Sequence, residues 1–147
     1  MVSLFYSLTI LNAWPGLAQM PNGNDIKSRD LPFTIEKTNS PPINITDFSA
    51  KLISDSFDVN QAIRLYLNYE NTSQMSINAI QLRFVLYDNN NNIVKSFLGS
   101  DNNLVLPNQT GSQKWQFQGM INSCSKLQVK LLKVKFDDGR IWQSNLD

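Results

Sequence analysis

The chain has 147 residues, of which 41% are hydrophobic and 17% charged, and its formal net charge is +1. This length is enough for one domain with a single hydrophobic core, and the composition is that of a folded protein rather than a disordered one. A net charge near zero gives no support to bulk binding of nucleic acid. The sequence has no histidine and one cysteine, Cys124, which excludes an intramolecular disulfide, the commonest general base and the commonest zinc ligand.

The first eighteen residues are typical of a secretory signal peptide. Residues 2–11 form an apolar run, a Pro-Gly break follows, and small residues precede a cleavage position after Ala18. The run is shorter than the ~20 apolar residues that a transmembrane helix needs. No positively charged side chain precedes Lys27, so the amino-terminal part of the signal is poor. We expect a secreted or periplasmic protein with no membrane span once residues 1–18 are removed.

Residues 19–42 are rich in turn-forming residues and include a Pro-Pro pair, which predicts a flexible linker or arm. The short apolar pieces around Phe33 and Ile35 leave an edge strand open within this range. Regular structure is expected afterwards, so that residues 43–147 form the folded domain.

Two segments alternate between apolar and polar residues, the pattern of strands with one buried face. Residues 62–69 follow it and end at a polar turn. Residues 76–88 repeat it, and we expect them to form the central strand of the domain, antiparallel to residues 62–69. A slip of one residue would turn the core side chains of either strand outward. The expected buried set is Ile63, Leu65, Leu67, Tyr69, Ile80, Leu82, Phe84 and Leu86.

The second half of the chain continues as strands separated by turns. Asp88 and the four asparagines that follow it predict a hairpin turn, because both residue types tolerate left-handed backbone conformations. The apolar phase of the last long strand changes between Leu131 and Leu132, which predicts a β-bulge or a crossover between sheets. Strands are expected at residues 93–98, 103–106, 114–119 and 127–136.

A closing hairpin is predicted at Asp138 and Gly139. Read as a two-residue turn, it places Phe136 opposite Ile141, with both side chains facing the core. The same register puts the neighbouring polar residues and one indole together on the outer face, namely Lys135, Asp137, Arg140 and Trp142. Seven or eight short strands without a helical period predict an all-β fold, an antiparallel two-sheet sandwich that is immunoglobulin-like in the broad sense.

Residues 84–88 read FVLYD and match the F-x-L-Y-D signature, so the sequence resembles the FxLYD-type domains, small β-sandwich modules of exported bacterial and archaeal proteins. The N-T-S triplet at residues 71–73 fits the pattern before the signature, and residues 134–142 look like the F-x-D-G-x-x-W ending of similar secreted domains. The resemblance spans residues 43–142 and departs at residues 67–69, where LNY replaces a glycine-containing strand. It implies a β-sandwich and export. It implies no active-site residue, because the family has no established catalytic site.

Trp142, Lys135 and Arg140 form the candidate ligand-binding group. An indole presented outward beside two cations can stack on a sugar ring or lie near an anionic group of the cell envelope. The alternative is that the two cations cover the indole and close the end of the sheet, with Asp137 paired to Arg140.

A second charged feature is the row of lysines on the last long strand. Such a row can face an acidic polymer or an anionic lipid surface. Alternatively, it is a solvated face whose charges protect the strand from aggregation. The row consists of Lys126, Lys130, Lys133 and Lys135.

The remaining polar patterns predict no chemistry. The turn at Asp88 lacks the glycine and the distal glutamate of a calcium loop, so no metal and no cofactor is expected. Cys124 has no base within sequence reach and is expected to be a small buried residue. Asn44, Asn71 and Asn108 begin formal glycosylation triplets, which matter only in a eukaryotic protein.

These observations predict a non-enzymatic exported β-sandwich module with a binding or spacer role at the cell envelope, whose partner is an unknown envelope protein or polysaccharide. The alternative is a carbohydrate-binding module in which Trp142 and an exposed Tyr66 stack on sugars. A hydrolase would need two convergent carboxylates, and Asp137 and Asp138 diverge as neighbours in a turn.

Overall fold

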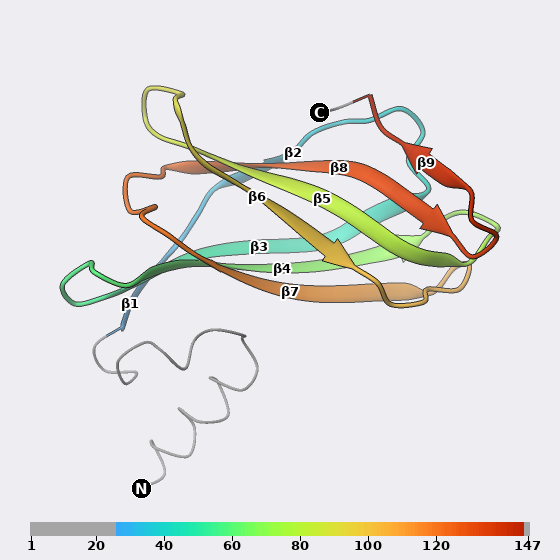
Figure 1. Ribbon diagram of the computed structural model, residues 1–147, viewed down its shortest axis with the longest axis horizontal. Helices are drawn as coiled ribbons and strands as arrows, with labels where there is room; N and C mark the ends of the chain where they lie inside the picture. The colour runs from blue at the N-terminus through green and yellow to red at the C-terminus, as the bar shows by residue number, and fades with distance from the viewer. Residues whose placement is uncertain (1–25, 146–147) are drawn as a thin grey trace, which may run out of the picture.

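The computed structural model describes residues 26–145, which form nine strands in two sheets and no helix (Figure 1). Sheet A has the strand order β1-β3-β4-β7, and sheet B has the order β2-β8-β5-β6 with β9 paired to β8. The strands are β1 (Ile26–Asp30), β2 (Phe33–Ile35), β3 (Ile43–Asp55), β4 (Gln61–Asn71), β5 (Ile77–Tyr87), β6 (Ile93–Asp101), β7 (Thr110–Gln118), β8 (Lys126–Phe136) and β9 (Ile141–Gln143). The predicted all-β sandwich is confirmed, with nine strands instead of seven or eight.

The core lies between the two sheets, where alternating apolar side chains from both inner faces meet. The eight side chains that the alternation of residues 62–69 and 76–88 predicts to be buried are all buried. Phe84 of β5 links the layers, since its ring centroid lies 6.1 Å from Phe48, 5.2 Å from Trp115 and 6.2 Å from Phe117. Three of these aromatic rings therefore come from sheet A and pack against the central strand of sheet B.

Strands β4 and β5 follow each other in the chain but belong to different sheets, so the predicted antiparallel pairing between them is wrong. β4 pairs with β3 and β7, whereas β5 pairs with β6 and β8. The buried side chain of Asn71 fixes the crossover: its Nδ2 donates to the carbonyl oxygens of Met75 (2.7 Å) and Val105 (3.0 Å), and its Oδ1 accepts from the backbone N–H of Ser73. Such a side chain satisfies the polar backbone groups that the crossover exposes.

Other predicted elements are confirmed or corrected by the strand register. Gln81 faces Lys133 and Leu82 faces Leu131, so Leu132 is the extra residue of the predicted β-bulge. Residues 103–106 form no strand, because only Val105 makes an isolated bridge, to Ile77. The turn at residues 88–92 does join β5 to β6 as a hairpin.

Residues 26–35 form two strands, in place of the linker or arm expected over residues 19–42. β1 pairs antiparallel with β3, and β2 pairs parallel with the start of β8 as the edge strand that the sequence had left open. The chain changes sheets between them: the Leu31 N–H donates to the Ala50 carbonyl, and the Leu127 N–H donates to the Pro32 carbonyl. The predicted signal peptide, residues 1–18, lies outside the described residues. Within residues 26–145 no helix is long and apolar enough to cross a membrane.

Candidate functional site

The closing hairpin has a different register from the predicted one. The N–H of Gly139 donates to the Phe136 carbonyl, the N–H of Phe136 donates to the Arg140 carbonyl, and Gly139 has a φ of +90°. This is a three-residue loop with a left-handed glycine, one residue longer than the predicted turn. Ile141 therefore lies opposite Lys135, and Trp142 lies opposite Val134.

A shift of one residue reverses the two faces of a strand. Ile141, predicted to face the core, is 58% exposed, and Trp142, predicted to face outward, is half-buried and packs against the core. The Trp142 indole N–H donates to the Asn39 carbonyl at 3.3 Å. The prediction of an outward indole is thus wrong, because the register of the hairpin is shifted by one residue.

The three predicted site residues do not form one group. Lys135 is exposed on the outer face of sheet B, on the side of the hairpin opposite to Trp142. Arg140 makes an ion pair with Asp138 (Nε–Oδ2, 2.7 Å), and not with Asp137 as the alternative interpretation had it. Tyr66, the second aromatic residue considered for sugar stacking, is half-buried on β4 of sheet A.

The structure brings together a different group of cations, on the outer face of sheet B. The bulge at Leu132 returns Lys133 and Lys135 to the side that already carries Lys130, although the apolar phase of the sequence changes there. Arg83 of β5 lies directly opposite Lys130. Arg83, Lys130, Lys133 and Lys135 are hereafter called the cationic face.

The cationic face is not neutralised by carboxylates. The ion pairs in residues 26–145 use three other cations, namely Lys27, Lys51 and Arg140. The Arg83 Nε is buried and has no hydrogen-bond partner within this part of the chain. Like charges directly opposite each other on neighbouring strands repel. A bound anion would therefore stabilise Arg83 and Lys130 in these opposite positions.

On the outer face of sheet A, the cations have acidic or polar partners. There Lys51 lies opposite Arg64, but the neighbouring strand adds Asp30, whose carboxylate is 3.8 Å from the Lys51 ammonium. Arg64 donates from Nε to the side chain of Gln116 at 3.1 Å. On sheet B, the Glu36 carboxylate follows β2 and accepts a hydrogen bond from the Gln128 side chain of β8. The two sheets thus differ in ion pairing: Lys51 on sheet A pairs with Asp30, whereas the cationic face of sheet B has no ion pair within the described residues.

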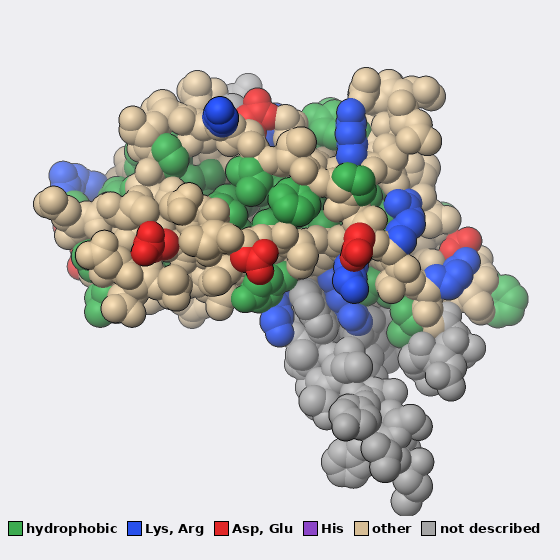
Figure 2. Space-filling view, turned by 180° about the vertical axis from the view of Figure 1, so that it is seen from behind, with side chains coloured by type: hydrophobic (Ala, Val, Ile, Leu, Met, Phe, Trp, Pro, Cys, Tyr) green, Lys and Arg blue, Asp and Glu red, His purple; other side chains and the backbone are tan. Residues whose placement is uncertain are grey.

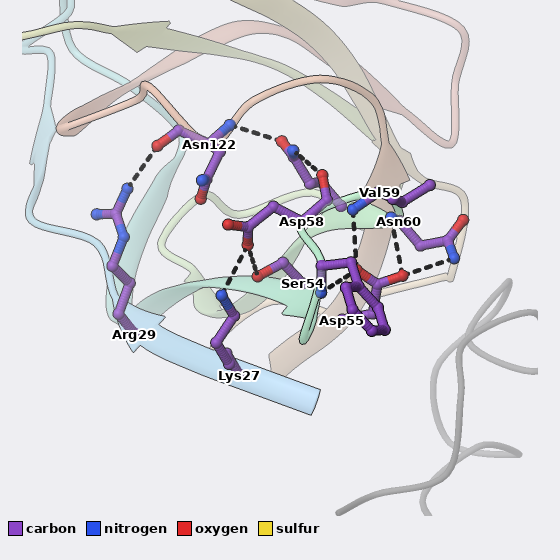
Figure 3. Close-up of polar contacts among 10 residues, drawn as sticks. Lys27, Arg29, Ser54, Asp55, Asp58, Val59, Asn60 and Asn122 are labelled. Atoms are coloured by element: carbon purple, nitrogen blue, oxygen red, sulfur yellow. Dashed lines mark hydrogen bonds and ion pairs between the residues drawn. The ribbon is translucent and has the colours of Figure 1, made fainter. Parts of the chain in front are cut away.

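A polar pocket of about 220 Å³ lies at the end of the sandwich where β1 begins (Figure 3). Asp58 is in an ion pair with Lys27 (3.0 Å) and accepts from the Ser54 hydroxyl (2.9 Å). Arg29 donates to the carbonyl oxygens of Asn122 (3.1 Å) and Cys124 (2.6 Å). These groups are ion-paired or hydrogen-bonded within the protein. They therefore connect β1 to two loops and do not form an open site.

Asp55 organises the β3–β4 loop beside this pocket. Desolvation alone would raise the pKa of Asp55, but its carboxylate accepts from the backbone N–H groups of Val59, Asn60 and Phe57, and together with the Asn60 amide these bonds lower the pKa below its ordinary value. The hydrogen bonds from Lys27 and Ser54 likewise lower the pKa of Asp58. Both carboxylates are ionised parts of the loop structure.

The other residues considered from the sequence have structural roles. Cys124 is buried as predicted; burial raises the pKa of its thiol, and Sγ contacts the Lys126 carbonyl. The Asp88 carboxylate accepts from the N–H groups of Asn90 and Asn92 within the hairpin turn. Among residues 26–145, no three acidic, cysteine or histidine side chains gather as metal ligands would.

The chain matches no family model and no curated protein. Among solved structures it is similar to a protein of Bordetella pertussis provisionally named ApaA, with a TM-score of 0.48, 9% sequence identity and coverage of 75% of this chain and 89% of that one. It is also similar to the Northeast Structural Genomics Consortium target SoR45, with a TM-score of 0.40, 10% identity and coverage of 80% and 75%. These are distant likenesses between all-β structures.

Proposed function

We propose that this chain is a non-enzymatic β-sandwich module of the cell envelope that binds an acidic polysaccharide through the cationic face. The observation that carries the proposal is the presence of four cations on one side of sheet B without an ion-pair partner in the described part of the chain. Along a strand, outward side chains recur about every 6.8 Å, so the face offers a row of positive charges to an extended polyanion.

The envelope location rests on the leader-like residues 1–18 and on the likeness to FxLYD-type domains. Within the fold, the FVLYD residues form the end of β5 and the start of its turn: Phe84 and Leu86 are in the core, and Asp88 holds the turn. The signature residues thus have structural roles in a strand and its turn, which is consistent with the proposed non-enzymatic module. Membership of the FxLYD group is part of the proposal.

The buried carboxylates are occupied by hydrogen bonds within the protein, and this supports a role in binding rather than catalysis. Asp55 and Asp101 are buried, and each accepts at least three hydrogen bonds from neighbouring groups. Carboxylates held in this way serve the loops around them. Stacking on neutral sugars is less well supported than charge recognition, because Tyr66 and Trp142 lie on different sheets and Trp142 faces the core.

A pair of charge-matched variants tests the proposal. The face variant is Lys130→Gln with Lys133→Gln and Lys135→Gln, and the control is Lys51→Gln with Lys95→Gln and Lys114→Gln. Each set removes three charges, so both proteins go from +1 to −2. Lys51 and Lys114 of the control lie on sheet A, and Lys95 lies opposite the core residue Leu86, on the side of sheet B away from the cationic face.

Binding to polygalacturonate, with neutral dextran as reference, is measured by calorimetry at low and high salt. We expect the face variant to bind about tenfold more weakly than the control, because exposed charge contacts contribute roughly 0.2–1 kcal/mol each. Wild-type binding is expected to weaken as salt rises. Equal losses in both variants, or binding that does not depend on salt, would contradict the proposal.

A further inference from the structure

A pocket of about 420 Å³ lies at the end of sheet B, between the β5–β6 turn and the start of β2. Its volume is within the range of about 300–1,000 Å³ that is usual for sites of small molecules. Figure 1 shows the β5–β6 turn at the upper left, above the start of β8. From behind, in Figure 2, basic and hydrophobic side chains lie beside the projecting turn at the upper right. The pocket is hereafter called the turn pocket; the rest of its wall is apolar, and the polar part consists of Thr34, Tyr87, Asn91, Lys126 and Gln128.

The aromatic ring in the turn pocket is held in place by a chain of hydrogen bonds. The Tyr87 hydroxyl donates to Gln128 Oε1 at 3.1 Å, and Gln128 Nε2 donates to the Glu36 carboxylate. All three side chains are half-buried, and they connect β5, β8 and the residue after β2. A ligand that packs on Tyr87 therefore pays little entropy to order the ring. The phenol oxygen keeps its capacity to accept a hydrogen bond from that ligand.

Lys126 gives the turn pocket its charge. Among the described residues that line the pocket it is the one charged side chain, and it is exposed. Its Nζ lies 5.8 Å from the centroid of the Tyr87 ring and donates to Asn91 Oδ1. Within residues 26–145 it makes no ion pair. Because an ammonium group has three donors, Lys126 can also donate to a ligand, and an anionic ligand is favoured.

The turn pocket lies on the same outer side of sheet B as the cationic face. Lys126 and Lys130 of β8 both point outward, and they lie opposite Tyr87 and Arg83 of β5, respectively. Positions four residues apart on a strand are separated by about 13–14 Å. An extended polymer that lies on the cationic face therefore reaches the pocket. This continuity identifies the occupant of the pocket as part of the ligand of the cationic face.

We infer that the turn pocket binds one uronic-acid residue of the acidic polysaccharide. The sugar carboxylate pairs with Lys126, the apolar face of the sugar ring packs on Tyr87, and the hydroxyl groups bond to the amides of Asn91 and Gln128. The inference rests on the proposed function and adds the class of sugar to it. The cationic face recognises charge alone, whereas the turn pocket offers an aromatic ring and two amides beside one cation.

An NMR titration of the isotope-labelled full chain with galacturonate tests the inference. Galactose, which lacks the carboxylate, and acetate, which lacks the ring, are the reference ligands. We expect galacturonate to shift the backbone amides of residues 87–91 and 126–128, and either reference ligand at the same concentration to shift them little. Lys126→Gln is expected to weaken galacturonate binding about two- to fivefold. Tyr87→Ala is expected to weaken it about two- to tenfold.

Two variants serve as matched controls. Lys95→Gln removes one positive charge from the other side of sheet B, and Tyr66→Ala removes a phenol from sheet A. Both are expected to bind galacturonate as the wild type does. Equal losses in the controls and the pocket variants would overturn the inference. Equal shifts with acetate would also overturn it, because the pocket would then recognise a carboxylate without a sugar. If Tyr87→Ala does not fold, Lys126→Gln decides, since that side chain is exposed.

Titration of the same protein with polygalacturonate separates the inference from the proposed function. We expect both ligands to bind, with galacturonate in the turn pocket. If the polymer binds through the cationic face while galacturonate leaves the pocket amides unmoved, the inference fails and the proposed function stands. If galacturonate binds in the pocket but the polymer does not bind, the proposed function fails, and the assignment of the pocket to a polymer fails with it. If neither ligand binds, both are wrong.

Discussion

Tyr69 and Asp101 form a hydrogen bond inside the core, where neither side chain is exposed. The phenol donates to Asp101 Oδ2 at 2.6 Å, and Asp101 Oδ1 accepts from Asn103 and from the Gln113 amide. Burial and the hydrogen bond to this carboxylate raise the pKa of Tyr69 well above its ordinary value, so the phenol remains a donor at neutral pH. A buried carboxylate without a cation is thereby supplied with donors on both oxygens.

Substitution of Tyr69 by Phe is expected to lower the free energy of unfolding by about 1–3 kcal/mol, because it removes a donor from a buried oxygen. Urea unfolding measures the effect. Tyr66→Phe is the control, since that phenol is half-buried on the outer face of sheet A and no comparable loss is expected. A loss of the same size in both variants would show that the Tyr69–Asp101 bond has no special role.

At the residue scale, the sequence identifies the apolar core but not the buried polar groups. Alternation alone places Phe84 and its neighbours inside, because the period of a strand decides which face is buried. Asn71, Asp101 and Gln61 look like ordinary turn or surface residues in the sequence. Their partners lie far away in the chain, as with Gln61 and Ile121, and no local pattern connects them.

The β3–β4 loop links stability to pH through Asp55 and Asp58. Both pKa values are lowered below the ordinary 3.8 in the folded protein, so the folded state keeps these groups ionised at pH values where the unfolded chain takes up protons. Their contribution is therefore full above about pH 4 and is lost as the pH falls through the folded values. Asp88 and Asp138, whose pKa values are also lowered, contribute in the same direction.

The melting temperature of the wild type is expected to fall as the pH is lowered below about 4. The double variant Asp55→Asn/Asp58→Asn should have a weaker pH dependence, with the remainder due to the other two carboxylates. Thermal unfolding followed by circular dichroism across the acid range measures this. An unchanged pH dependence in the double variant would contradict the account of the loop.

The closing hairpin makes a second prediction at the scale of elements. Trp142→Ala is expected to destabilise the protein by about 1–3 kcal/mol, less than the truncation of a fully buried tryptophan, because the indole packs against the core from a half-buried position. Ile141→Ala should change the stability by less than about 0.5 kcal/mol. Denaturant unfolding of the two variants compares them. If Ile141→Ala destabilised the protein more than Trp142→Ala, the result would contradict this register and favour the one with a two-residue turn.

The two main errors at this scale have related causes. The residues Asp138 and Gly139 predict a turn but do not determine its length, and one added residue reverses the faces of β9. The alternation of β4 and β5 is the same whether they pair within one sheet or face each other across the core. For the long alternating strands, local sequence therefore predicts the strand and its buried face more reliably than it predicts the partner of that strand; for the short β9, the face depends on the length of the turn.

At the scale of the whole molecule, the net charge of +1 conceals an uneven distribution. The lysines of β8 are visible in the sequence, but their alignment depends on the bulge at Leu132, and the addition of Arg83 depends on the pairing of β5 with β8. Sheet A balances its cations with Asp30 and with polar neighbours, whereas sheet B does not. The central claim is that the cationic face of sheet B is the binding surface of the module.

The most direct test of that claim is an NMR titration of the isotope-labelled full chain with polygalacturonate fragments. We predict amide shift changes concentrated in β5 and β8, around Arg83 and Lys130, that diminish as salt is added. Changes concentrated on β3, β4 and β7, or around Tyr66, would contradict the claim and would place the binding surface on sheet A.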